Sequence, residues 1–175
     1  SILSQDPPAG GFEVIVADGL SDDGTREILA RLVETDIRLR VVDNLQKITP
    51  CGMNAGIQQS RGRYIAIMGA HNRYAPDYLL RAVQILEETG ADNVGGAMLC
   101  ESNSWTQRAI AAAHHSAFSV GGARWHNVNY EGPADTVFGG VYRREVFCRI
   151  GLFDEELVRN QDDAFNLRLI RAGGS

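Results

Sequence analysis

The chain has 175 residues, which suits one domain that buries roughly two-thirds of its unfolded surface on folding. Apolar residues make up 44% of it and charged residues 22%, a composition that excludes a disordered chain. The 22 acidic residues outnumber the 17 lysines and arginines, and the net charge of -5 argues against general attraction to nucleic acid. No apolar run approaches the roughly 18 residues needed to span a bilayer.

The cysteines and the start of the chain indicate its setting. Cys51, Cys100 and Cys148 are too few and too scattered for a disulfide framework or a metal-binding pair, which predicts a reduced, cytosolic environment. The chain begins at Ser1 rather than at a methionine, and residues 1–5 resemble the last turn of a helix. We therefore expect residues 1–175 to form a single domain, truncated at both ends, of a longer protein.

Hydrophobic patterning predicts strands that alternate with helices along the chain. The first predicted strand is short, β-branched and nearly continuous in apolar character, which is typical of a strand buried on both faces. In chain order, the predicted elements are a strand at 12–17, a helix around 28–33, a strand at 39–42, a helix at 52–60, a strand at 63–68, a helix at 76–89, a strand at 94–99, a helix at 104–118, a strand at 136–142, a short helix near 145 and a helix at 162–172.

Several predicted helices carry end signals. Pro76 suits a first helical position, and Gly90 suits the residue that follows a helix. Ser104 and Gln107 have the spacing of a capping box, in which two side chains satisfy the first free N–H groups of a helix. The alternation of strands and helices predicts an α/β fold with a mostly parallel sheet.

Parallel sheets bind ligands beyond the carboxyl ends of their strands. Asp18 follows the first predicted strand, Asp43 the second, and residues 69–71 the third. Because parallel strands end at one edge, we expect these three turns to lie at the same edge of the sheet.

The turn after the first strand is rich in carboxylates. Asp22 and Asp23 are best explained as acids that favour the start of a helix, whereas Asp18 fits that role and ligand binding equally well. The chain has no GxxxxGK[ST] or GxGxxG motif, and the acids lack EF-hand spacing. Phosphate-loop, dinucleotide and calcium sites of those types are therefore excluded.

The histidines and a second acidic cluster are further candidates. His71 follows the third strand and is either a polar loop residue or a ligand for a divalent metal. His114 and His115 are adjacent on a predicted helix and point about 100° apart, so they do not share a metal. Asp162 and Asp163 open the last helix, where they either favour its dipole or include a general base.

Taken together, four stretches resemble the family 2 glycosyltransferases of the GT-A fold, in particular the succinoglycan-biosynthesis (ExoA-like) group. They are 13–25 (EVIVADGLSDDGT), 54–65 with its NAGI and RGRYI segments, 69–79 (GAHNRYAPDYL), and 142–163 with its YRREVF, GLFDE and NQDD segments. The resemblance spans nearly the whole chain in the family's order. It implies a Rossmann-like, mostly parallel sheet flanked by helices, which lacks the family's first strand because that strand would precede Ser1.

The resemblance also implies roles for individual residues. Asp18 matches the acid that recognises the nucleotide base, and Asp162, with Asp163 as the alternative, matches the general base. His71 matches the last position of the D-x-D element, which contacts Mg²⁺ or Mn²⁺ on the diphosphate. Two positions depart from the family's pattern, since Gly69 stands at the first Asp of that element and Gln161 at the Glu before the base. Asn54, Gly69 and Ala70 fall within the family's substrate-binding stretches.

The implied function is an inverting transfer of a hexose from a UDP-sugar to a polysaccharide or lipid-linked glycan acceptor, in exopolysaccharide or other cell-surface glycan synthesis. We expect residues 119–134, with Arg124, Trp125 and His126, to face the acceptor. We also expect cytoplasmic location at the inner face of the plasma membrane, with membrane association only through segments outside this chain. The alternatives are a non-catalytic relative that binds a nucleotide or glycan, and a nucleotidyltransferase.

Overall fold

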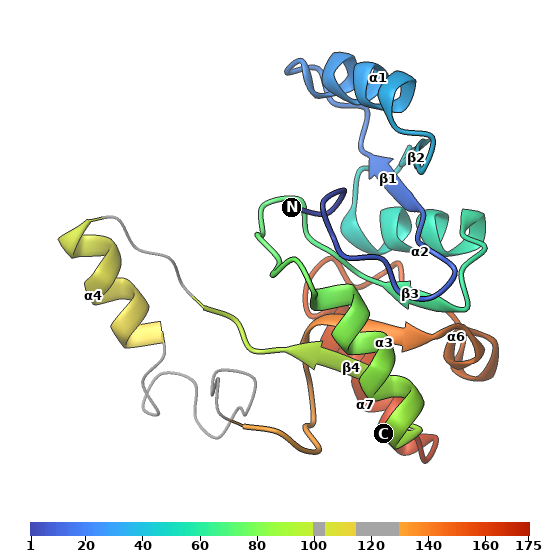
Figure 1. Cartoon of the computed structure of the whole chain (residues 1–175), viewed down its shortest axis with the longest axis vertical. Coiled ribbons are helices and arrows are strands. Elements are labelled where there is room, and N and C mark those ends of the chain that lie inside the picture. Colours follow the sequence, from blue (N-terminus) through green and yellow to red (C-terminus); the bar gives the residue numbers. More distant parts are fainter. Residues whose placement is uncertain (100–103, 115–129) are drawn as a thin grey trace.

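The computed structural model describes residues 1–99, 104–114 and 130–175, and in these ranges strands alternate with helices as predicted (Figure 1). The strands are β1 (Val14–Asp18), β2 (Leu39–Asp43), β3 (Tyr64–Ala66), β4 (Asn93–Gly96) and β5 (Phe138–Arg143). The helices are α1 (Thr25–Thr35), α2 (Thr49–Gln59), α3 (Tyr78–Thr89), α4 (Trp105–His114), α6 (Arg144–Ile150) and α7 (Gln161–Arg171). No helix in these ranges combines the length and the apolar character that crossing a membrane requires.

The described strands form two sheets. β1 and β2 pair in parallel, in a register that puts Asp18 opposite Asp43. In the second sheet, β5 lies between β3 and β4 and runs antiparallel to both, so β3 and β4 run in the same direction. The alternating pattern predicted the parallel pair. The strand predicted at 136–142 corresponds to β5, but its antiparallel direction was not predicted, because the connection before it carries little patterning.

The starts of β1, β2 and β3 meet at one edge of the molecule. The Glu13 carboxylate, just before β1, accepts hydrogen bonds from the backbone N–H groups of Arg61 and Gly62, just before β3. On β2, Arg40 donates from Nη2 both to Glu13 (2.7 Å) and to the carbonyl of Gln59 at the end of α2 (2.9 Å). These contacts hold the starts of the three strands together.

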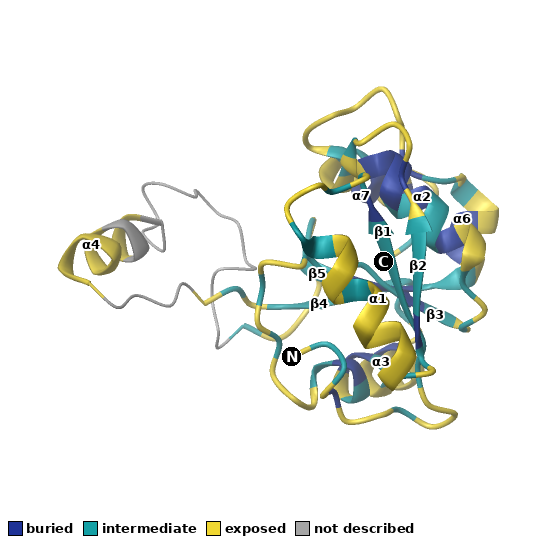
Figure 2. Cartoon of the chain, turned by 90° about the horizontal axis from the view of Figure 1, so that it is seen from above, coloured by how far each residue is buried: buried dark blue, intermediate teal, exposed yellow. Residues whose placement is uncertain are grey.

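The core lies on both faces of β5. Val141 faces α3, where it packs with Leu79, Ala82 and Leu86. Its neighbour Tyr142 points to the other face, as the two-residue period of a strand requires. There it joins a larger cluster that includes residues of α2, α6 and α7: Ile57, Ile65, Val146, Phe147, Phe153, Phe165 and Leu169. The second sheet is thus sandwiched between α3 and α7 (Figure 1), whereas α1 has no buried residue (Figure 2).

The predicted end signals are confirmed at the end of α3 and at the start of α4, and the start of α3 is shifted. Gly90 ends α3 in the left-handed conformation (φ 74°). Ser104 and Gln107 form the capping box at α4, each accepting from the other's backbone N–H at 3.1 Å. Pro76 lies before α3 rather than in its first turn, because residues 75–78 form a separate turn closed by the N–H of Tyr78.

Candidate active site

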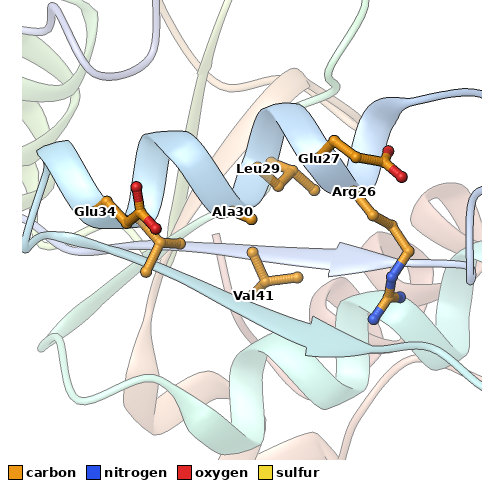
Figure 3. Close-up of a pocket in the computed structure, with 7 residues that line it drawn as sticks. Arg26, Glu27, Leu29, Ala30, Glu34 and Val41 are labelled. Carbon is orange, nitrogen blue, oxygen red and sulfur yellow. The ribbon is translucent and has the colours of Figure 1, made fainter.

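Asp18 forms a charged cluster at the carboxyl end of β1. Its Oδ1 accepts from Ser21 Oγ (2.6 Å), and its Oδ2 accepts from the Ser21 backbone N–H (3.1 Å) and from Arg26 Nη1 (2.8 Å). The same Arg26 nitrogen donates to Asp43 at the end of β2 (2.9 Å). Figure 3 shows Arg26 reaching from the first turn of α1 toward the carboxyl ends of the two strands. Arg26 therefore bridges the carboxyl ends of β1 and β2, which the sequence analysis expected at one edge of the sheet.

The surroundings of Asp18 favour its charged form. The Ser21 hydroxyl lowers the pKa of Asp18 most; partial desolvation opposes that shift, and the Ser21 N–H and Arg26 add to it. The residue is only 5% exposed. By contrast, Asp23 accepts from the N–H of Thr25 at the start of α1, the helix-start role expected for it. Asp18 is thus a buried, ionised carboxylate at a strand end.

Asn54 lies inside the molecule rather than at an open edge. It is 3% exposed, and its side chain contacts the segment that follows α6. Its Nδ2 donates to the Phe153 carbonyl and to Glu155 Oε1, both at 2.9 Å, while its Oδ1 accepts from the Phe153 N–H at 3.0 Å. Both N–H donors of the amide are therefore used within the protein.

The turn after β3 is arranged around Gly69. Its N–H donates to the Tyr74 hydroxyl (2.9 Å), and its carbonyl accepts from the Asn72 N–H (3.2 Å). A Cβ on Gly69 would lie 2.6 Å from Asn72 Nδ2, so the Asn72 amide fills the space where a longer side chain at position 69 would begin. Ala70 and His71 are exposed at the tip of this turn.

Asp162 and Asp163 lie in the first turn of α7 and differ in their contacts. Asp163 Oδ1 accepts from Thr136 Oγ1 at 3.1 Å, and that hydroxyl in turn accepts from Asn166 Nδ2 at 3.1 Å. The Asp162 side chain has no hydrogen bond or ion pair to any residue that the structure describes. Burial raises the pKa of Tyr142, and the negative charge of the Asp162 carboxylate raises it further. Asp162 is exposed.

Hydrogen bonds and a ring contact link the start of α7 to the turn after β3. Tyr74, whose hydroxyl accepts from Gly69, packs its ring on Tyr78, with the centroids 5.3 Å apart. The Tyr78 hydroxyl donates to the Gly139 carbonyl at 2.8 Å, at the start of β5. Thr136, the partner of Asp163, lies just before that strand. Because β5 is antiparallel to β3 and β4, its start lies beside their carboxyl ends. The structure thus brings the turn at 69–71 and the acids of α7 to the same edge.

Metal-ligating side chains are sparse at this edge. Within residues 1–99, 104–114 and 130–175, no three His, Cys, Asp or Glu side chains lie close enough to hold a metal ion. Asp18 and Asp43 are engaged by Arg26, and Gly69 has no side chain, which leaves the His71 imidazole in the turn after β3. A divalent cation of the Mg²⁺ type prefers several oxygen ligands, so the residues at this turn do not fit such a site.

Several residues that contact the candidate site residues were not predicted from the sequence. Arg26 was not singled out, because an arginine in the first turn of a helix is usually a solvated charge. Thr136 and Asn166 were not singled out either, since each acts only through a contact distant in sequence. Tyr74 and Tyr78, which lie four residues apart at the start of α3, could have been found as an aromatic pair. Of the expected acceptor loop at 119–134, residues 119–129 lie outside the described residues, as does His115.

An open hollow lies elsewhere, under α1. Its lining comes from one face of α1 and from β2: Arg26, Glu27, Leu29, Ala30, Val33, Glu34 and Val41 (Figure 3). Of these lining residues, only Arg26 contacts a candidate site residue. The hollow is therefore distinct from the candidate site.

Comparison with known proteins identifies relatives. The family model described as "Glycosyl transferase family 2" matches residues 1–151. The chain is 35% identical over 163 residues to the succinoglycan biosynthesis protein ExoA of Rhizobium meliloti (strain 1021), covering 91% of this chain and 49% of that protein. It is 27% identical to glycosyltransferase AglE of Haloferax volcanii, over all of this chain and 56% of that protein. The chain thus spans about half the length of the curated relatives it matches.

A solved structure has the same fold. TarS of S. aureus, in complex with UDP-GlcNAc, superimposes with a TM-score of 0.65 at 17% identity and covers 95% of this chain and 46% of its own. At that identity the likeness concerns the fold. Together with the family match, it confirms the predicted GT-A architecture of α/β class.

Proposed function

Because the chain belongs to the family 2 glycosyltransferases, as its motifs predicted, we propose that it carries out an inverting hexosyl transfer from a UDP-sugar. The acceptor in this proposal is a growing polysaccharide or a lipid-linked glycan of the cell surface. The observation that carries the proposal is Asp162, an exposed carboxylate in the first turn of α7 without a partner among the described residues, at the same edge as the turn after β3.

In the proposed reaction, an acceptor hydroxyl attacks the anomeric carbon of the donor sugar. A new C–O bond forms as the bond from that carbon to the nucleoside diphosphate breaks, and the hydroxyl proton passes to Asp162. Attack opposite the leaving group inverts the anomeric centre, by analogy with inverting glycosidases. Negative charge in the first turn of a helix is favoured by its dipole, which suits a base that must stay ionised. Asp163, held by Thr136, is the alternative base.

Asp18 is the proposed recognition residue for the nucleotide base. A carboxylate offers about four lone-pair sites, and three are occupied by Ser21 and Arg26. One acceptor site is left for an N–H group of the base. Gly69 and Ala70 would then contribute backbone close to the diphosphate, since Gly69 has no side chain and that of Ala70 is a single methyl group. Asn54 is proposed to act on the site from within rather than by touching the substrate.

Mg²⁺ or Mn²⁺ on the diphosphate, with His71 as its ligand, follows from the family resemblance. Such an ion supplies positive charge to a departing diphosphate. The ligand set in the described residues does not fit it, so no step of the proposed reaction depends on the ion. Location at the cytoplasmic face of the plasma membrane, through segments outside this chain, is part of the same proposal.

A second candidate is a non-catalytic relative that binds a nucleotide or glycan. The observation that favours it is Gly69, which has no carboxylate and whose neighbouring space is filled by the Asn72 amide. The nucleotidyltransferase alternative has no comparable support, since the matching family transfers sugars.

A panel of UDP-sugars, offered to the full-length protein with and without Mn²⁺ and with a glycan acceptor, tests the proposal. We expect UDP release that depends on one sugar and a product of inverted anomeric configuration. Tight binding of a UDP-sugar without turnover would instead support the second candidate. Pyrophosphate release from a nucleoside triphosphate would support a nucleotidyltransferase.

A further inference from the structure

The side chain of Asn54 forms hydrogen bonds with the backbone of Phe153, which lies 99 residues later in the sequence. Its amide pairs with both backbone groups of that residue, donating to the carbonyl and accepting from the N–H. This is the pattern that a neighbouring strand would supply, provided here by one buried side chain. The second Nδ2 proton bonds Glu155, two residues further along.

A second residue of α2 reinforces the attachment. Cys51 lies one helical turn before Asn54 and is also buried. Burial raises the pKa of the Cys51 thiol, and its hydrogen bond with Glu155 raises it further. The carboxylate of Glu155 is therefore bound by two side chains that project from the same face of α2.

The ring of Phe153 is held from the other side by α7. It packs on Phe165 with the ring centroids 4.5 Å apart, and Phe165 is 0% exposed. Phe165 lies three residues after Asp162 on the same helix, and residues with that spacing share a face. Phe153 is thus fixed through its backbone by α2 and through its ring by the helix that carries Asp162.

We propose that Asn54 is a positioning residue for the transfer step, which fixes the segment before α7 and thereby the place of Asp162 at the edge of the sheet. This inference rests on the proposed function, in which Asp162 takes the proton. Proton transfer requires the base within hydrogen-bond reach of the hydroxyl, and a shift of about 1 Å can cost about 10²-fold in rate. An amide is required at position 54 because Asn54 must donate twice and accept once. An aspartate there would place negative charge against Glu155 and against the Phe153 carbonyl.

The test compares Asn54→Asp with the double variant Asn54→Asp/Glu155→Gln in the full-length protein. Gln58→Ala, at an exposed position of α2, is the matched control. The first readout is hydrogen–deuterium exchange in residues 151–165, which reports the position of this segment whether or not the protein is active. The second is the separation of kcat from the donor KM.

For Asn54→Asp we expect faster exchange in residues 151–165 and a kcat about tenfold to a hundredfold lower, with an unchanged donor KM. Glu155→Gln in the same chain should recover part of both losses, because it places a donor opposite the carboxylate introduced at position 54. Unchanged exchange, or a raised donor KM at constant kcat, would overturn the inference. If the unsubstituted protein transfers no sugar, the proposed function fails, and the exchange measurement still decides whether Asn54 fixes this segment.

Discussion

Replacing Phe165 with alanine tests whether α7 is anchored by its aromatic contacts. Phe165 is fully buried against Phe153, Phe147 and Tyr142, at centroid distances of 4.5, 5.2 and 5.4 Å. Truncating a buried phenylalanine costs about 3–5 kcal/mol, the lost transfer free energy plus the cavity left behind. Total stabilities are about 5–15 kcal/mol, so this one change removes a large share of the free energy of unfolding.

Urea unfolding followed by far-UV circular dichroism measures the effect. With a slope of about 2 kcal/mol per molar urea, a loss near 4 kcal/mol lowers the midpoint by about 2 M. Leu167→Ala is the matched control, because Leu167 lies on the same helix and is 49% exposed. Its loss should stay near 1 kcal/mol, since about half of the side chain is already in water. Equal midpoint shifts in the two variants would refute the assignment of Phe165 as the anchor.

Two further predictions concern the edge of the sheet. Since the Ser21 hydroxyl and its other partners lower the pKa of Asp18, the carboxylate stabilises the fold above its ordinary pKa of about 4 and this contribution is lost as the pH falls below that value. Asp18→Asn should therefore flatten the fall in Tm between pH 6 and pH 3, and an unchanged pH dependence would contradict this. The second change, Gly69→Asp together with Asn72→Ala to clear the space, adds a carboxylate beside His71 and should tighten Mn²⁺ binding in titration calorimetry. Mn²⁺ affinity that stays the same, or a gain that survives His71→Ala, would contradict that reading of the turn.

The sequence specified the elements whose signals are local. The apolar run at 12–17 predicted β1, and the capping-box spacing of Ser104 and Gln107 predicted the start of α4. Gly90 marked the end of α3 because glycine adopts the left-handed conformation at no steric cost. Strand pairing depends on residues distant in the chain. For that reason the insertion of β5 between β3 and β4 had no local signature.

The same distinction holds at the candidate site. Asp18, Asp162 and the turn at 69–71 were identified because each follows a strand or opens a helix. Their partners were not identified, since Arg26 and Thr136 act through contacts that appear only after folding. Asn54 was expected to bind substrate because of its motif, and its burial against Phe153 is the basis of the positioning role proposed above. Residue type and position indicated the candidate groups, and the fold revealed which residues hold them in place.

The proposed function depends on Asp162 as the acceptor of the proton from the attacking hydroxyl. The most direct measurement is kcat for UDP release by the full-length protein with Asp162→Asn, compared with Asp163→Asn, alongside the Kd for UDP of each variant. We expect Asp162→Asn to lower kcat by about 10²–10⁴-fold while the Kd for UDP is retained. Asp163→Asn should lose much less, because its amide oxygen can still accept from Thr136. An Asp162→Asn variant that keeps the turnover of the unsubstituted protein would rule out Asp162 as the base.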